Sequence, residues 1–127
     1  MGENEIASHI VDSAIKIHRK LGPGLLESVY RSVLAHELSI RGLKVERERP
    51  IPVSYEGLLL ETAYRADLVV NDKVIVEVKS IEQIAPVHKK PLLTYLKLAD
   101  KRLGLLINFN VFLVKDGITR VANGFAD

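Results

Sequence analysis

The chain has 127 residues, 47% of them apolar, a formal net charge of +2 and no cysteine, which excludes disulfides, thiolate zinc sites, iron–sulfur clusters and a cysteine nucleophile. Its length fits one domain (residues 1–127), and its small net charge means that any contact with nucleic acid is local. No apolar run could span a bilayer and the N-terminus lacks a secretory signal, so we expect a cytoplasmic protein without membrane contact.

The first 42 residues carry a helical apolar period. Its spacing predicts an amphipathic helix over 4–21, which "LGPG" at 21–24 should end. A second helix is expected from just after Gly24 to about Gly42. Its apolar positions should face inward: Leu26, Val29, Val33, Leu34 and Leu38.

Beyond Gly42 the period changes to that of strands. Short strands are expected at 43–49 and 51–55, followed by a turn at 56–57 and a return strand. The segments 64–70 and 73–79 should form a hairpin around Asn71 and Asp72.

The last third of the chain mixes both periods. A third helix is expected at about 87–100, with Leu92, Leu96, Ala99 and Leu103 on one stripe. "GLLINFN" predicts a buried strand, and "FLVKDGITRVA" predicts a hairpin about Asp116–Gly117. This order of elements indicates a central mixed β-sheet flanked by helices, in the α+β or α/β class.

The segment "VIVEVKS" at 74–80 carries two charges inside an apolar strand. Side chains alternate along a strand, so the valines point one way while Ile75, Glu77 and Lys79 point the other. A buried charge is costly unless it is paired or neutralised. The segment is therefore either part of an internal ion pair or part of an active site.

The position of Asp67 depends on the length of the preceding loop. A three-residue loop pairs Val70 with Val74 and sets Asp67 opposite Glu77, whereas a two-residue loop puts the two acids on opposite faces. Two carboxylates ~4–5 Å apart repel by roughly 3–4 kcal/mol at an effective dielectric near 20. Such a pair needs a proton, a cation or solvent, and Lys79 and Arg65 could supply positive charge.

Two interpretations of these charges stay open. Arg65, Asp67, Glu77 and Lys79 could form exposed cross-strand pairs with a structural role only. Alternatively, two carboxylates could hold Mg²⁺ or Mn²⁺ while a lysine assists hydrolysis of a phosphodiester. The valine and isoleucine residues around each charge favour a central strand, and so favour the second interpretation.

Asp67 followed by Glu77-x-Lys79 resembles the core motif of the PD-(D/E)XK nuclease superfamily. "GLLESVY" at 24–30 is similar to the signature of the GxxExxY family, a bacterial and archaeal group within it. "YRADLVV", "VIVEVKS", "APVHKKPLLTYLKL" and "GLLINFN" follow in the same order, over about residues 5–122. The resemblance implies a restriction-endonuclease-like core and a metal-dependent nuclease that hydrolyses nucleic acid.

The resemblance also implies the site residues. Glu27, Asp67 and Glu77 would hold Mg²⁺ or Mn²⁺, Lys79 would be the catalytic lysine, and Tyr95 would be either a site residue or part of the core. The substrate would be nucleic acid, with DNA expected, bound through its backbone. From the residues alone, Glu27 could instead cap its helix, and Tyr30 could either hydrogen-bond into the site or merely pack.

One position departs from the family pattern. Pro91 stands where the resemblance implies a glutamine four residues before Tyr95, which removes an amide side chain and a backbone donor. The proline costs little if it lies in the first turn of its helix. A weakly active or inactive module that binds nucleic acid or a protein partner is therefore the alternative function.

Three further features are weaker. His88 lacks the spaced partners of a metal ligand. Lys90, Lys97 and Lys101 form a stripe that is either solvated surface or a phosphate contact. A homodimer is expected on grounds of economy, because one small site cuts one strand.

Overall fold

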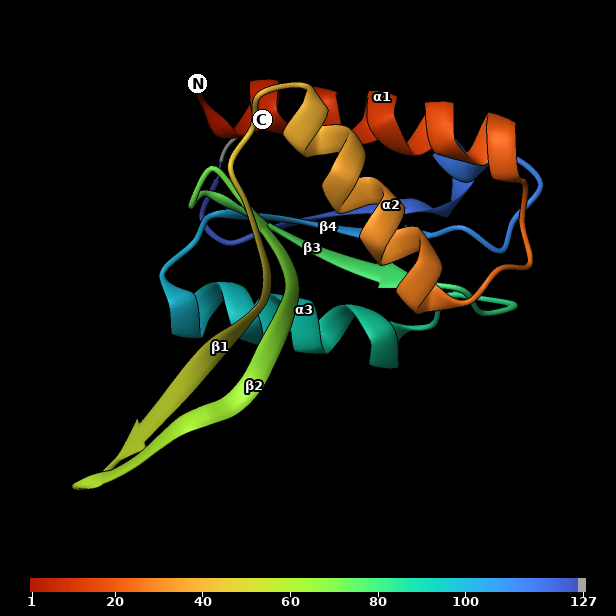
Figure 1. Cartoon of the computed structure of the whole chain (residues 1–127). Coiled ribbons are helices and arrows are strands. Elements are labelled where there is room, and N and C mark those ends of the chain that lie inside the picture. The colour runs from red at the N-terminus through yellow and green to blue at the C-terminus, as the bar shows by residue number, and fades with distance from the viewer. Residues whose placement is uncertain (126–127) are drawn as a thin grey trace.

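The computed structural model describes residues 1–125 and contains five strands, three helices and one 3₁₀ turn. In chain order they are α1 (Glu3–Leu21), α2 (Glu27–Ile40), β1 (Val45–Tyr55), β2 (Leu58–Val70), β3 (Val74–Lys79), α3 (Pro86–Ala99), β4 (Leu103–Asn108), η1 (Val114–Gly117) and β5 (Ile118–Ala122). The strands form one sheet in the order β1-β2-β3-β4-β5. The layers are visible in Figure 1.

The sheet lies between two layers of helices (Figure 1). On one face α1 and α2 bury residues at helical spacing, such as Ile6, Ile10 and Leu34, against Val76 and Val78 of β3. On the other face Leu92 and Leu96 of α3 pack on a second apolar cluster of the sheet. Together with its strand pairing, this arrangement confirms the expected mixed sheet flanked by helices.

β3 is the central strand of the sheet, and the strands around it run in both directions. β1, β2 and β3 are successively antiparallel, β3 and β4 are parallel across the α3 connection, and β5 is antiparallel to β4. In β3 every residue from Val74 to Val78 is buried. The charges of this strand therefore lie in the middle of the sheet and not on a wet edge. None of the helices within residues 1–125 is both long and apolar enough to cross a bilayer.

Several local predictions about the helices were wrong. Leu26 and Val29 are 72% and 39% exposed, because α2 begins only at Glu27 and turns these positions outward. Leu103 belongs to β4 and not to the stripe of α3. α3 begins at Pro86, so Pro91 lies in its second turn instead of its first. There it offers no N–H to the carbonyl of Val87, and it interrupts the helical hydrogen bonding.

Two strand predictions also differ from the structure. The expected strands at 43–49 and 51–55 are one strand, β1, with a register shift between Ile51 and Val53. The hairpin expected about Asp116–Gly117 is absent from the described chain. The residues expected to form its first strand form no strand and lead into the short turn η1. The second strand, β5, pairs with β4 instead. Gly117 lies so close to the backbone oxygen of Asn108 that no side chain would fit there.

Candidate active site at the end of the central strand

The loop between β2 and β3 has three residues. Val70 pairs with Val74 and Leu68 with Val76, where the ladder ends, and one further step in this register sets Asp67 opposite Glu77. Asn71 and Asp72 both adopt positive φ values, of 51° and 55°, which closes the loop within this length. The condition that brings the two acids to one face is therefore confirmed.

The strand β2 changes face at Asp67. Ala66 packs in the cluster under α3, whereas Leu68 packs in the cluster under α1 and α2. Residues two apart share a face in an unbroken strand, so the alternation is interrupted between them. On the neighbouring strand Glu48 has a φ of 51°, and the ladder lacks the Glu48–Asp67 pair. This irregularity frees the backbone of Asp67 for other contacts.

The side chains of Asp67 and Glu77 take the place of the interrupted backbone pairing. The N–H of Asp67 donates to Oε1 of Glu77 at 3.2 Å, and the N–H of Val78 donates to Oδ2 of Asp67 at 2.8 Å. Nη1 of Arg31, from α2, donates to Oδ1 of Asp67 at 3.1 Å. The sequence allows Arg65 as a cation near Asp67, whereas the guanidinium that pairs with Asp67 in the structure belongs to Arg31.

Glu77 is a buried acid held next to another acid. Its residue is 8% exposed. Burial, and then the negative charge of Asp67, raise the pKa of Glu77 to about 8, while the charge of Lys79 acts in the opposite direction. A cation close to this carboxyl group would stabilise its ionised form and so lower its pKa.

Lys79 and Tyr95 complete the surroundings of Glu77. By strand alternation Lys79 shares the face of Glu77, and within residues 1–125 its ammonium donates no hydrogen bond to another side chain. Tyr95 is half-buried, and its pKa is raised first by burial and then by the charge of Glu77. Its ring contacts that of Tyr64, with the two ring centres 5.2 Å apart. Tyr95 also packs against the apolar cluster under α3, so its role as a site residue or as part of the core stays a prediction.

Glu27 reaches the same end of β3 from the first turn of α2. Its Oε1 accepts a hydrogen bond from the N–H of Ser80 at 3.4 Å, one residue beyond Lys79. The hydroxyl of Ser80 donates to the carbonyl of Leu25 at 2.7 Å. These two contacts join the start of α2 to the end of the central strand.

Tyr30 fixes the loop that precedes Glu27. It is fully buried, and its ring stacks on Phe109 with the centres 4.4 Å apart. Its hydroxyl donates to the carbonyl of Gly22 and accepts from the N–H of Leu25. Gly24, between these two residues, has a φ of 96°, which favours glycine. The segment Gly24–Tyr30 is thus a structural unit that presents Glu27. Tyr30 packs in the core, which is one of the two alternatives for this residue.

A family model described as the PD-(D/E)XK nuclease superfamily matches residues 4–121 of the chain. This chain belongs to the PD-(D/E)XK nuclease superfamily. No curated protein and no solved structure matches it significantly. Membership places the chain among nuclease-type proteins, whereas the narrower assignment to the GxxExxY family stays a prediction.

The donor set of this PD-(D/E)XK chain fits a hard divalent cation. Asp67 and Glu77 are adjacent carboxyl groups, and Mg²⁺ commonly binds through one or two carboxylates, waters and substrate phosphates. In the described part of the chain no three acidic or histidine side chains form a ready cluster. Glu27 is joined to the pair only through the end of β3, so its role as a third ligand stays a prediction.

Two other side chains have clear structural roles. Nδ1 of His88 accepts from the N–H of Ala85 at 2.8 Å and so caps the start of α3. Lys101 follows α3 and forms an ion pair with Asp72 at 3.1 Å, so it is not part of a helical stripe. Lys90 and Lys97 remain exposed on α3.

Sequence reasoning missed three residues that shape this site. Arg31 lies four positions after Glu27 and so on its side of the helix, which is a signal that could have identified it. Ser80 directly follows the lysine of the motif. Asn108 is buried, and its side chain accepts from the N–H of Ile81 and donates to the carbonyl of the same residue, which holds the chain beyond Lys79. No sequence pattern indicated Asn108.

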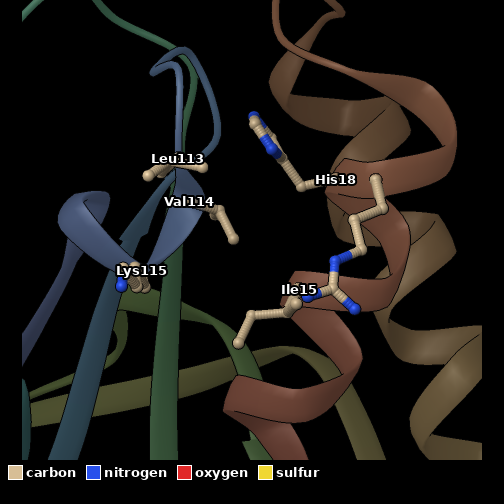
Figure 2. Close-up of a pocket in the computed structure, with 6 residues that line it drawn as sticks. Ile15, His18, Leu113, Val114 and Lys115 are labelled. Carbon is tan, nitrogen blue, oxygen red and sulfur yellow. The ribbon is translucent and has the colours of Figure 1, made fainter.

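A hollow of about 190 Å³ between α1 and the turn η1 lies away from these acids. Figure 2 shows His18 and Ile15 of α1 facing Leu113 and Val114 across it. Nε2 of His18 is 3.1 Å from the carbonyl oxygen of Phe109, so the imidazole is already engaged. The lining contains no carboxylate, and the hollow offers no chemistry comparable to that around Glu77.

Proposed function

We propose that this protein is a metal-dependent nuclease that hydrolyses phosphodiester bonds in nucleic acid. The observation that carries the proposal is the pairing of two acids at the centre of a sheet, next to a lysine whose ammonium donates no hydrogen bond to another side chain within residues 1–125. Burial of Glu77 beside Asp67 costs stability, so a structural role alone gives no reason for it.

In this proposal each residue has one task. Asp67 and Glu77 hold Mg²⁺ or Mn²⁺, with Glu27 as the third acid. The bound cation would supply positive charge that lowers the pKa of a coordinated water. Lys79 orients that water and offers its ammonium to the charge that develops on the phosphate. Tyr95 lines the same space and positions the substrate.

The surroundings of Glu27 support binding to a nucleic-acid backbone. A surface hollow next to it is lined by Ser28, Arg31, Ser80 and Asn110, whose polar side chains suit phosphate and sugar groups. Such contacts position a strand without reading its sequence. DNA is the expected substrate, and the test must include RNA.

The test is cleavage of single- and double-stranded DNA and RNA with Mg²⁺ or Mn²⁺. We expect Asp67→Ala and Lys79→Ala each to lower the rate by at least about 100-fold, the usual size of such losses. Lys115→Ala, a change of an exposed lysine on η1, is the matched control and should keep the wild-type rate. Activity that survives both site changes would remove the proposed site.

A module that binds nucleic acid or a protein with little or no turnover is the second candidate. Two observations favour it: Arg31 already pairs with Asp67, and Pro91 interrupts α3 where the family resemblance implies glutamine. Calorimetric titration with Mn²⁺ beside the cleavage assay separates the two. Metal binding without cleavage of any nucleic acid supports the module.

A further inference from the structure

The outer part of β1 and β2 forms an arm that extends away from the helices (Figure 1). Beyond the register shift after Ile51, Val53 pairs with Leu60 and Tyr55 pairs with Leu58. Large apolar side chains on this arm are exposed: Tyr55 by 67%, Leu58 by 55%, Leu59 by 56% and Leu60 by 48%. The arm therefore presents to solvent the kind of residue that the rest of the sheet buries.

One face of the arm is entirely uncharged. Directly paired residues and residues two apart share a face, so Val53, Tyr55, Leu58 and Leu60 lie together; we call them the arm face. Ile51, two residues before Val53, packs in the cluster under α3. The arm face begins on the far side of the register shift that follows Ile51, outside the cluster that α3 covers. Leu59 lies on the opposite face.

The arm face needs a cover for two physical reasons. An isolated two-stranded hairpin is at best marginally stable in water. The exposed parts of Tyr55, Leu58 and Leu60, together with that of Tyr64 at the base of the arm, amount to on the order of 400 Å², near the apolar share of a standard interface of about 800 Å² per partner. The exposed patch has the size of an interface and not of scattered surface residues.

We propose that this chain forms a two-fold symmetric dimer in which the arm face packs on the arm face of a second copy. A two-fold axis brings the same patch of each copy together, so any charge within it would meet a like charge. The arm face contains none. Glu56 lies in the turn at the tip, and Glu61 follows Leu60 on the other side by alternation. This inference does not depend on the proposed nuclease function.

The experiment measures the mass of the full chain in solution by light scattering coupled to gel filtration at about 100 µM. We expect twice the 14.2 kDa of one chain. The double change Leu58→Asp and Leu60→Asp should give the monomer mass, because it places charges at the centre of the arm face. Leu59→Asp is the matched control: it changes the same residue type at almost the same exposure on the opposite face, and the dimer should persist.

A wild-type mass of one chain at that concentration overturns the proposal, whether or not another protein can bind the arm. Dissociation by Leu59→Asp to the same extent as by the double change also overturns it. Amide hydrogen exchange of the wild type gives a test without substitutions. Protection of residues 53–60 should rise with protein concentration, and constant protection contradicts the dimer.

Discussion

Glu37 and Glu77 are two glutamates buried to nearly the same extent, 7% and 8% exposed, in opposite electrostatic surroundings. Glu37, on α2, accepts hydrogen bonds from the ammonium of Lys16 on α1, and this lowers its pKa. Glu77, on β3, lies beside Asp67, and its pKa is raised to about 8 by burial and by that neighbouring charge. One acid has its own cation and the other has a second acid.

The difference shows which of the two acids is explained by the fold. Glu37 joins two helices through an ion pair, a common structural arrangement. Glu77 lowers stability where it lies, and such local conflicts concentrate at functional sites. The comparison can be tested by removing the charge of each acid, or the cation beside it.

The largest effect is expected from Glu77→Gln on the pH dependence of stability. The folded protein keeps the proton of Glu77 up to about pH 8, whereas the unfolded chain loses it near pH 4.5. Between these values the folded state binds more protons, so the free energy of unfolding falls as pH rises, by up to about 1.4 kcal/mol per pH unit. Glu77→Gln should abolish this fall, as measured by urea denaturation from pH 5 to 9 with EDTA.

Glu37→Gln is the matched control for that measurement. Its folded pKa is lowered, so Glu37 contributes stability that is present above its unfolded pKa and is lost in acid. The variant should be less stable than the wild type but keep the same fall between pH 5 and 8. An unchanged fall in Glu77→Gln would contradict the buried, protonated state of Glu77.

The sequence predicted the layers of this fold well because those depend on periodicity. The valine alternation of β3 and the helical spacing in α1 each record which side chains face the core. The β2–β3 register stayed open between a two-residue and a three-residue loop, and the structure shows the three-residue loop. The C-terminal hairpin was misplaced because strand pairing depends on tertiary contacts: β5 pairs with β4 and not with its own preceding segment.

The acids and the lysine of the candidate site were predictable from the sequence, but the side-chain contacts that hold them were not. Asp67, Glu77 and Lys79 follow from strand alternation and register. Arg31 and Asn108 reach the site from distant parts of the chain, and their contacts span 36 and 27 residues. The spacing from Glu27 places Arg31 on the same side of α2, but its pairing with Asp67 leaves no local pattern and had to be seen in the structure.

An effect of intermediate size is expected from Arg31→Met, which removes the cation beside Asp67. Arg31 is the cation beside Asp67, as Lys16 is beside Glu37, and its removal leaves the acid pair more negative. We expect Mn²⁺ to bind about tenfold more tightly, equivalent to ~1.4 kcal/mol, because the metal no longer competes with a guanidinium. Calorimetric titration at pH 8 measures this. Arg47→Met changes another arginine that reaches α2, through Ser32, and should leave the affinity unchanged. Weaker binding in Arg31→Met would show that the guanidinium supports the metal site instead.

The smallest effect is expected from Lys16→Met. The side chain of Lys16 is 58% exposed, and ion pairs with an exposed partner contribute little, so the loss should be about 1 kcal/mol at neutral pH. Chemical denaturation measures it, and adding Glu37→Gln to Lys16→Met should recover most of the loss because no unpaired acid then remains. Mn²⁺ binding and cleavage should not change in either variant. A change in either would link Glu37 to the site around Glu77, and the two acids would then no longer represent separate structural and functional roles.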